Sequence, residues 1–297
     1  MMATDAASAQ RGAGAIRRLR SAETKRLAGG RIGLRWQPVE PYRGVLARAF
    51  PEWADALRNA PGSAIVPAGD IAALRELLRL LRRHPWIDTT LTECYALDMN
   101  RTRPVRGPPP PDLALYRPSE RFTRLGTLLR RAKGYDGTPI NRRLGDLLAA
   151  ECVAFVRRQP TLRRADVILP VPPSQSRGKY CLPAYLAARM AAELGIEARG
   201  DRLQRSPTAV TLRPMKERTS REKWDIASGL LEADSAVAGA RVLLLDDLQQ
   251  SGATLFAAGE ALREAGAAEV YGLTVVKTWP DEPTRWPPPR GALCGAR

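Results

Sequence analysis

Short apolar runs alternate with amphipathic stretches through the second half of the chain. The apolar runs cover 167–171, 242–245 and 270–276, and between them apolar positions recur at helical spacing, as in 182–194 and 255–265. Short apolar runs are typical of strands buried on both faces, and their alternation with helices predicts βαβ units. We therefore expect an α/β fold, with a twisted parallel sheet flanked by helices.

The first hundred residues follow a different pattern. Helical spacing covers 42–59 and 70–84, and Asp70 is a residue type that caps helices. A short run at 89–97 fits a strand. We expect a mostly helical accessory region here, ending at the proline-rich stretch 101–112, which favours extended backbone.

These patterns divide the chain into four segments. Residues 1–35 lack periodicity and are expected to form a flexible basic arm, whereas the tryptophan- and proline-rich end is expected to be a disordered tail. The four segments are the arm at 1–35, an accessory or hood region at 36–112, the main domain at 113–279 and the tail at 280–297.

Positive charge is the least ordinary property of the composition. The 297 residues include 47 Lys and Arg against 31 Asp and Glu, a net charge of +16, and eight of the basic residues lie within 1–35. This balance favours polyanionic partners, either nucleic acid bound through the basic arm or a substrate that carries phosphates. An arginine-rich proteome would give the same excess without such a partner.

The rarer residue types exclude several classes of protein. His84 is the only histidine, and none of the four cysteines form a C-x-x-C pair, which argues against histidine bases, zinc ribbons and a disulfide framework. At the end of its helix, a cationic or partly cationic His84 ring would suit the helix dipole, a structural role. No apolar stretch is long enough to cross a bilayer and no apolar leader begins the chain. We expect a cytoplasmic protein with no membrane contact.

Two acids and a turn of small residues follow the apolar run at 242–245. Asp246 and Asp247 can accept hydrogen bonds from vicinal hydroxyls or face Mg²⁺. The turn leads into a helix, where free amides and the positive end of the dipole hold phosphate, and Gly252 allows close backbone approach. The residues of this turn are Gln250, Ser251, Gly252, Ala253 and Thr254. A diol binder followed by a phosphate cradle is the pattern of a ribose 5-phosphate site.

A plainer interpretation is that the two acids end a strand and Ser251 caps a helix. Paired acids at a strand end also occur in receiver folds and in metal-dependent phosphatase folds. The turn Ser251 to Thr254 and the helix that follows favour the ribose phosphate interpretation.

Residues 243–255 resemble the phosphoribosyl pyrophosphate (PRPP) motif of type I phosphoribosyltransferases, with Gln250 where the motif has its first Thr. Residues 113–278 resemble more narrowly the ComF-like, competence-associated branch, without that branch's N-terminal zinc ribbon. Three segments carry this resemblance: Pro170 to Gly178, similar to the first strand and pyrophosphate loop; Lys133-Gly134, similar to a short Lys-Tyr-x-Gly-like segment; and 203–224, similar to the flexible loop.

The resemblance implies a type I phosphoribosyltransferase-like sheet that binds PRPP and Mg²⁺. The implied reaction transfers a phosphoribosyl group to or from a nitrogen nucleophile, such as a nucleobase, and releases pyrophosphate. The resemblance implies that Asp246 and Asp247 are catalytic residues and that they bind Mg²⁺, either directly or through water. The implied pyrophosphate contacts are Pro172, Ser174, Arg177 and Gly178, with Lys216 or Arg218 from a closing lid. For the two lid cations, a solvated basic loop is the plainer interpretation.

Two alternatives to this enzyme remain open. One is a catalytically silent PRPP-binding or DNA-associated module of the ComF type, acting in DNA uptake, recombination or regulation. The other is a regulator that senses PRPP without releasing pyrophosphate. The sequence identifies neither the acceptor nor the oligomeric state.

Overall fold

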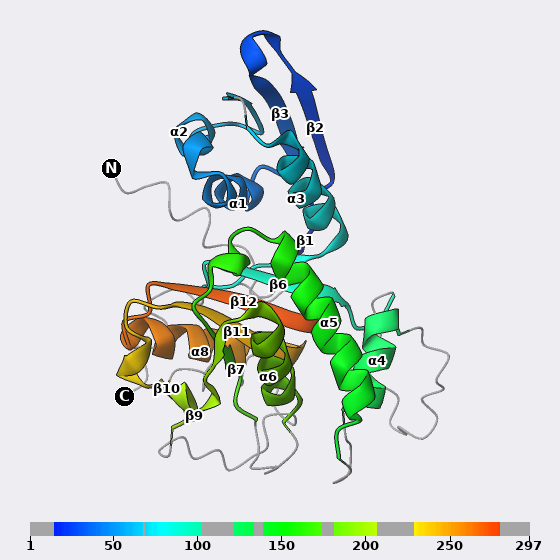
Figure 1. Ribbon diagram of the computed structural model, residues 1–297, viewed down its shortest axis with the longest axis vertical. Coiled ribbons are helices and arrows are strands. Elements are labelled where there is room, and N and C mark those ends of the chain that lie inside the picture. Colours follow the sequence, from blue (N-terminus) through cyan, green and yellow to red (C-terminus); the bar gives the residue numbers. More distant parts are fainter. Residues whose placement is uncertain are drawn as a thin grey trace, which may run out of the picture.

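The computed structural model describes residues 15–67, 69–102, 122–133, 139–173, 181–206 and 229–279. Its main body is a seven-stranded sheet with the order β1-β5-β6-β12-β11-β7-β8, shown in Figure 1. The strands are β1 (Ile16–Arg17), β5 (Trp86–Ile87), β6 (Glu93–Met99), β7 (Val167–Pro170), β8 (Glu197–Ala198), β11 (Arg241–Gln249) and β12 (Glu269–Lys277). The five neighbouring strands β6, β12, β11, β7 and β8 pair in parallel. β1 and β5 pair antiparallel to their neighbours and form one edge of the sheet.

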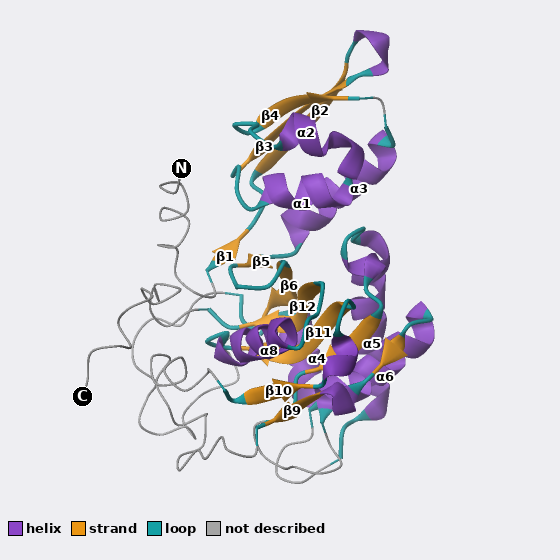
Figure 2. Ribbon diagram, turned by 90° about the vertical axis from the view of Figure 1, so that its left-hand side faces the viewer, coloured by secondary structure: helices purple, strands orange, loops and turns teal. Residues whose placement is uncertain are grey.

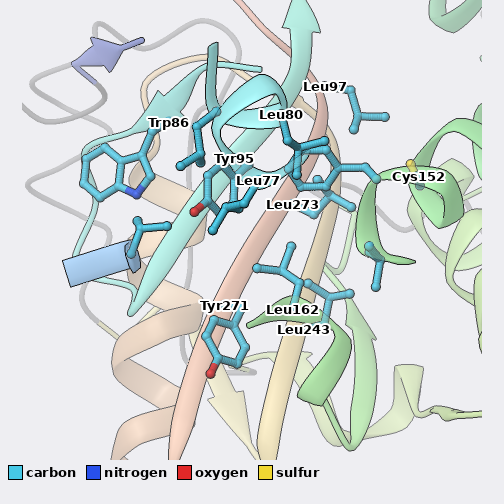
Figure 3. Packing of buried hydrophobic residues seen from close by; sticks show 14 of the residues in the cluster. Leu77, Leu80, Trp86, Tyr95, Leu97, Cys152, Leu162, Leu243, Tyr271 and Leu273 are labelled. Carbon is cyan, nitrogen blue, oxygen red and sulfur yellow. The ribbon is translucent and has the colours of Figure 1, made fainter. Parts of the chain in front are cut away.

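Helices cover both faces of this sheet. The helices α4 (Arg124–Ala132), α5 (Arg142–Arg158) and α6 (Leu182–Leu194) lie on one face, and α8 (Ala253–Glu264) lies on the other beside the antiparallel pair of β9 (Leu203–Arg205) and β10 (Leu231–Ala233). Side chains of β11 alternate between the two cores, because Leu243 and Leu245 pack with α5 and α6 whereas Val242 and Leu244 pack with α8. Figure 3 shows Leu243 in the first of these cores, near Leu162 and Tyr271. The expected α/β fold with a mostly parallel, helix-flanked sheet is confirmed.

A second layered unit, the N-terminal lobe (residues 18–84), lies beyond the β6 side of the sheet (Figure 2). Its antiparallel sheet has the order β2-β3-β4, and three helices pack on one face of it. The elements are β2 (Ser21–Arg26), β3 (Ile32–Gln37), α1 (Tyr42–Ala49), α2 (Ala54–Leu57), β4 (Ser63–Val66) and α3 (Ile71–Arg83). Asp70 caps α3 as predicted, since its carboxylate accepts from the amides of Ala72 and Ala73.

The structure corrects the expected flexible arm over residues 15–35. These residues form β1, β2 and most of β3, in which Ile32 and Leu34 are each only 2% exposed. The alternation of these buried residues with Arg31, Gly33 and Arg35 has the period of a strand, but the high arginine content concealed it. Residues 1–14 of the expected arm lie outside the described residues.

The expected boundary at residue 112 does not separate the main sheet from the region before it. β6 pairs with β12 in the middle of the sheet, with Tyr95 opposite Leu273, so a strand of the expected accessory region belongs to the main sheet. That region also contains β4 and the end of β3, so a small sheet lies beside its helices in the part described. Most of the proline-rich stretch (103–112) and the tail (280–297) lie outside the described residues.

A buried polar cluster joins the N-terminal lobe to the start of β6. The carboxylate of Glu93 is completely buried and accepts hydrogen bonds from Arg48 Nε of α1 (2.7 Å), Tyr95 Oη (2.6 Å) and Thr161 Oγ1 (2.8 Å). Gln159 donates through Nε2 to Tyr95 Oη at 2.8 Å. Within this cluster, Glu93, Tyr95, Gln159 and Thr161 therefore satisfy one another, as the low dielectric of a protein interior demands.

His84 is a neutral core residue. Its ring lies edge-on to Phe155, and Nδ1 is 2.8 Å from the carbonyl oxygen of Leu97. Burial lowers the pKa of His84, which favours the neutral ring. The structure therefore supports the expected structural role of His84, but the expectation of a cationic or partly cationic ring was wrong. Within the described part of the chain, no helix has the length and apolar character to cross a membrane.

Candidate functional site

The path of the chain through the sheet creates a switch point between β7 and β11. From β7 the chain continues outward to β8, whereas from β11 it continues in the opposite direction to β12. Helix-linked parallel strands leave a crevice beyond their carboxyl ends where such a reversal occurs, and ligands bind there. The amide of Val171 donates to the carbonyl of Leu245 at 2.8 Å, where the pairing of β7 with β11 ends, so Pro172, Asp246 and Asp247 lie at the same edge of the sheet.

Asp246 and Asp247 occupy the carboxyl-terminal part of β11. Asp247 is 5% exposed and Asp246 is half-buried. Asp246 Oδ1 accepts a hydrogen bond from the amide of Asp247 at 2.8 Å. Burial, and then the neighbouring charge of Asp247, raise the pKa of Asp246 to about 7, while Lys133 acts in the opposite direction. Hydroxyl donors or a cation at this position would offset the crowded negative charge.

Lys133 supplies part of that positive charge. Its Nζ lies 2.7 Å from Asp247 Oδ2, and it directly follows α4. The sequence pointed to Lys133 only through the family resemblance and gave it no role in the site. Its position became evident only once the packing of α4 against the sheet was known, because α4 and β11 are far apart in the sequence.

The turn after β11 has the geometry of an anion cradle. Gly252 has φ +84°, in the left-handed region that favours glycine, and α8 begins at Ala253. Ser251 Oγ accepts from the amide of Ala253 at 3.3 Å, so Ser251 does act as a local cap. Among the described residues, the amides of Ser251, Gly252 and Thr254 have no protein acceptor, which leaves three donors at the positive end of α8.

Lys277 supports this turn from β12. The residue is 1% exposed, and its Nζ donates to the carbonyl oxygens of Gln250 (2.6 Å) and Thr278 (2.8 Å). It therefore holds the turn in place and adds a buried positive charge beside it. We did not identify Lys277 from the sequence, although a lysine at the end of a long apolar run was a usable signal.

The predicted site residues divide into two groups. Those that the structure brings to one edge of the sheet are Pro172, Asp246, Asp247, Gln250, Ser251, Gly252, Ala253 and Thr254. Those that lie outside the described residues, and so stay predictions, are Ser174, Arg177, Gly178, Lys216 and Arg218.

The donor set at this edge fits one kind of metal ion. Among the residues described, no three His, Cys, Asp or Glu side chains gather to hold a metal by themselves. Mg²⁺ is commonly held by one or two carboxylates together with the phosphates of a substrate and water. Asp246 and Asp247, beside the turn that begins α8, match that pattern.

Several solved structures are similar to this chain. Glutamine phosphoribosylpyrophosphate amidotransferase from B. subtilis, complexed with ADP and GMP, is 26% identical with a TM-score of 0.29, over 44% of this chain and 25% of that one. Purine phosphoribosyltransferase from Pyrococcus horikoshii Ot3 is 17% identical with a TM-score of 0.29, over 50% of this chain and 96% of that one. The allosteric regulatory enzyme of purine biosynthesis is 16% identical with a TM-score of 0.34, over 83% of this chain and 45% of that one.

This chain thus spans about a quarter of the first protein and less than half of the third. No protein-family model matches the chain. No curated protein matches it either.

Proposed function

We propose that this chain binds PRPP and transfers its phosphoribosyl group to a nitrogen nucleophile such as a nucleobase, or catalyses the reverse transfer. One observation carries the proposal: an acidic pair and an amide-lined turn follow one another at the switch point of a parallel sheet. This order suits a ribose 5-phosphate, whose vicinal hydroxyls and phosphate are separated by the length of the sugar. Carboxylates accept from hydroxyls, and free amides at a helix start hold phosphate.

Different residues bind different parts of PRPP. Asp246 accepts hydrogen bonds from the ribose hydroxyls, and the amides of Gly252 and Thr254 hold the 5-phosphate. Lys277 keeps the turn in its binding shape through the Gln250 carbonyl. Asp246 and Asp247 would hold Mg²⁺, which when bound neutralises charge on the pyrophosphate.

The chemistry requires little acid–base catalysis on the sugar. The bond from ribose C1 to the pyrophosphate oxygen breaks, a bond from C1 to the acceptor nitrogen forms, and an N–H acceptor releases a proton. The group that needs stabilisation is the leaving pyrophosphate, which cations and amides stabilise in a site that excludes water. We assign this role to Arg177 and the backbone near Ser174 and Gly178, with Lys216 or Arg218 from a lid.

A turnover screen tests the proposal. We expect PRPP-dependent pyrophosphate release with at least one member of a panel of nucleobases and amines, and no release from the variant that carries both Asp246→Asn and Asp247→Asn. PRPP binding without release from any acceptor would favour the silent module or the PRPP-sensing regulator. Absence of both binding and release would overturn the proposal.

A second candidate function, nucleic-acid association of the ComF type, is favoured by the surface of the N-terminal lobe. Residues 18–84 contain 13 Lys and Arg but only 6 Asp and Glu. Arg75, Arg79 and Arg82 lie exposed along α3 at helical spacing, a row of positive charges that suits a phosphate backbone.

The test of this second candidate is salt-dependent binding of a single-stranded oligonucleotide. We expect replacement of Arg75, Arg79 and Arg82 by Gln to weaken binding and flatten its salt dependence. The matched change at three exposed arginines of α5, which are Arg142, Arg143 and Arg157, should leave both unaltered. Equal effects from both sets would contradict an interface on α3. Point substitutions are preferable to removal of 1–35, which would delete β2.

A further inference from the structure

One carboxylate oxygen of Asp247 is held by charge alone. Oδ2 is buried, and among the described residues no donor directs a hydrogen bond at it. Its counter-ion is the ammonium of Lys133, with Nζ at 2.7 Å. Buried anionic oxygens in proteins are usually satisfied by directed donors, so this oxygen keeps the capacity to bind a further donor or another cation.

The two partners of this ion pair differ in their freedom to move. Asp247 lies within β11, where Asp246 and Leu248 on either side of it both pair with β12, and its side chain is only 7% exposed. Lys133 follows the last residue of α4, and its side chain is 37% exposed on a flexible four-carbon stem. The ammonium can therefore move into water while the carboxylate stays in place, so Lys133 is the partner that can be exchanged.

A divalent cation and this ammonium compete for the same carboxylate. Mg²⁺ is held by one or two carboxylates together with phosphate oxygens and water, and Asp246 and Asp247 supply the carboxylates at this edge of the sheet. A cation bound to Asp247 would lie within a few ångströms of Lys133 Nζ. Positive charges so close together repel strongly where little water screens them. Free cations should therefore bind poorly while Lys133 holds its place.

We propose that Lys133 excludes free divalent cations from the ligand-free site and leaves Asp247 only when a cation arrives bound to pyrophosphate oxygens. Those oxygens lower the net charge of the cation and offer the displaced ammonium a new anionic partner, which offsets the loss of the ion pair. This inference rests on the proposed binding of PRPP with Mg²⁺. It adds a role for Lys133, which sets the order in which metal and substrate enter.

The test measures the binding of Mn²⁺ alone, an ion that suits the same oxygen ligands as Mg²⁺. The electron paramagnetic resonance signal of the free ion reports binding, so neither substrate nor turnover is needed. We expect the wild type to bind Mn²⁺ weakly and Lys133→Met to bind it about 10-fold or more tightly. Lys133→Arg keeps the charge and should behave as the wild type. The matched control is Arg131→Met, which removes an exposed charge from the same helix and should also behave as the wild type.

Two further measurements identify the carboxylate. Asp247→Asn, added to Lys133→Met, should abolish the gain in Mn²⁺ affinity. Because Lys133→Met leaves the carboxylate of Asp247 without its counter-ion, Mn²⁺ should raise the thermal midpoint of that variant more than the midpoint of the wild type. Lys133→Gln, a neutral polar variant, should show the same gain and replaces Lys133→Met if the latter does not fold.

The outcomes separate this inference from the proposed function. Equal Mn²⁺ affinities in the wild type and the neutral Lys133 variants, whether weak or tight, would overturn the inference, as would a gain that survives Asp247→Asn. In that case the proposed function stands if PRPP with Mg²⁺ still binds to the wild type in a calorimetric titration. If PRPP does not bind but the neutral variants gain Mn²⁺ affinity, the proposed function falls and only the exclusion of free cations by Lys133 stands.

Discussion

Lys133 and Asp247 form an ion pair, with Nζ 2.7 Å from Oδ2, that joins the end of α4 to the carboxyl end of β11. The side chain of Lys133 is 37% exposed and that of Asp247 is 7% exposed, so the carboxylate is largely shielded from water and the ammonium is not. The pair therefore places a cation within the acidic site before any ligand binds, and it lowers the pKa of the adjacent Asp246.

Replacement of Lys133 by Met is expected to move the pH dependence of PRPP binding upward. Without the ammonium, burial and Asp247 act on Asp246 unopposed, and the pKa of Asp246 rises further. PRPP titrations over a range of pH should therefore show a higher midpoint in Lys133→Met. Lys133→Arg, which keeps the charge, should behave as the wild type; an unchanged midpoint in Lys133→Met would contradict a role for this pair.

Asp246 should link the stability of the ligand-free protein to pH. The folded state holds a proton on Asp246 up to about pH 7, whereas the unfolded state releases it near the ordinary value of 3.8. The folded state thus binds more protons over this interval, so the free energy of unfolding falls as pH rises through it. Urea denaturation at several pH values should show this decline in the wild type and a weaker one in Asp246→Asn. Equal slopes would show that Asp246 has an ordinary pKa.

Gly252→Ala should weaken PRPP binding beyond its effect on stability. A residue with a Cβ is strained at φ +84°, at a cost of about 1 kcal/mol, and the turn would shift its amides to relieve the strain. Gly239→Ala is the matched control, because Gly239 has φ +72° and open space around the added atom. Both variants should lose similar stability, but only Gly252→Ala should bind PRPP more weakly. Equal PRPP affinities in the two variants would argue against the cradle.

Glu93→Gln should reduce stability without affecting PRPP binding. The change removes the charge that pairs with Arg48, and breaking a buried pair costs about 3–5 kcal/mol. Because Arg48 is 34% exposed, we expect a smaller loss, about 2 kcal/mol in the free energy of unfolding. Glu93 begins β6, at the opposite end of the sheet from Asp247, so PRPP titrations should match the wild type. Weaker PRPP binding in a folded Glu93→Gln protein would show that the two ends are coupled.

The sequence was most informative where local rules and tertiary structure agree. The apolar run at 242–245 and the helix after Gly252 were predicted because burial on both faces and helical periodicity leave plain patterns. Asp246, Asp247 and the turn were identified for the same reason, since the candidate chemistry lies within one continuous segment.

The sequence was least informative where distant segments meet. Residues 15–35 form strands whose alternation is hidden by arginines, and the place of β6 in the main sheet depends on pairing with β12, far away in the chain. Lys133 and Lys277 reach the site for the same reason, through packing between elements rather than spacing along the chain.

Calorimetric titration of PRPP, with Mg²⁺ present, into the wild type and into the variant carrying both Asp246→Asn and Asp247→Asn is the most direct test of the acidic pair. We expect the double variant to lose about 2–4 kcal/mol of binding free energy, roughly 30- to 1000-fold in Kd, the scale of lost charge-assisted hydrogen bonds. The exposed Asp201→Asn serves as the control and should bind as the wild type does. An unchanged Kd in the folded double variant would contradict the assignment of these two carboxylates to the ribose.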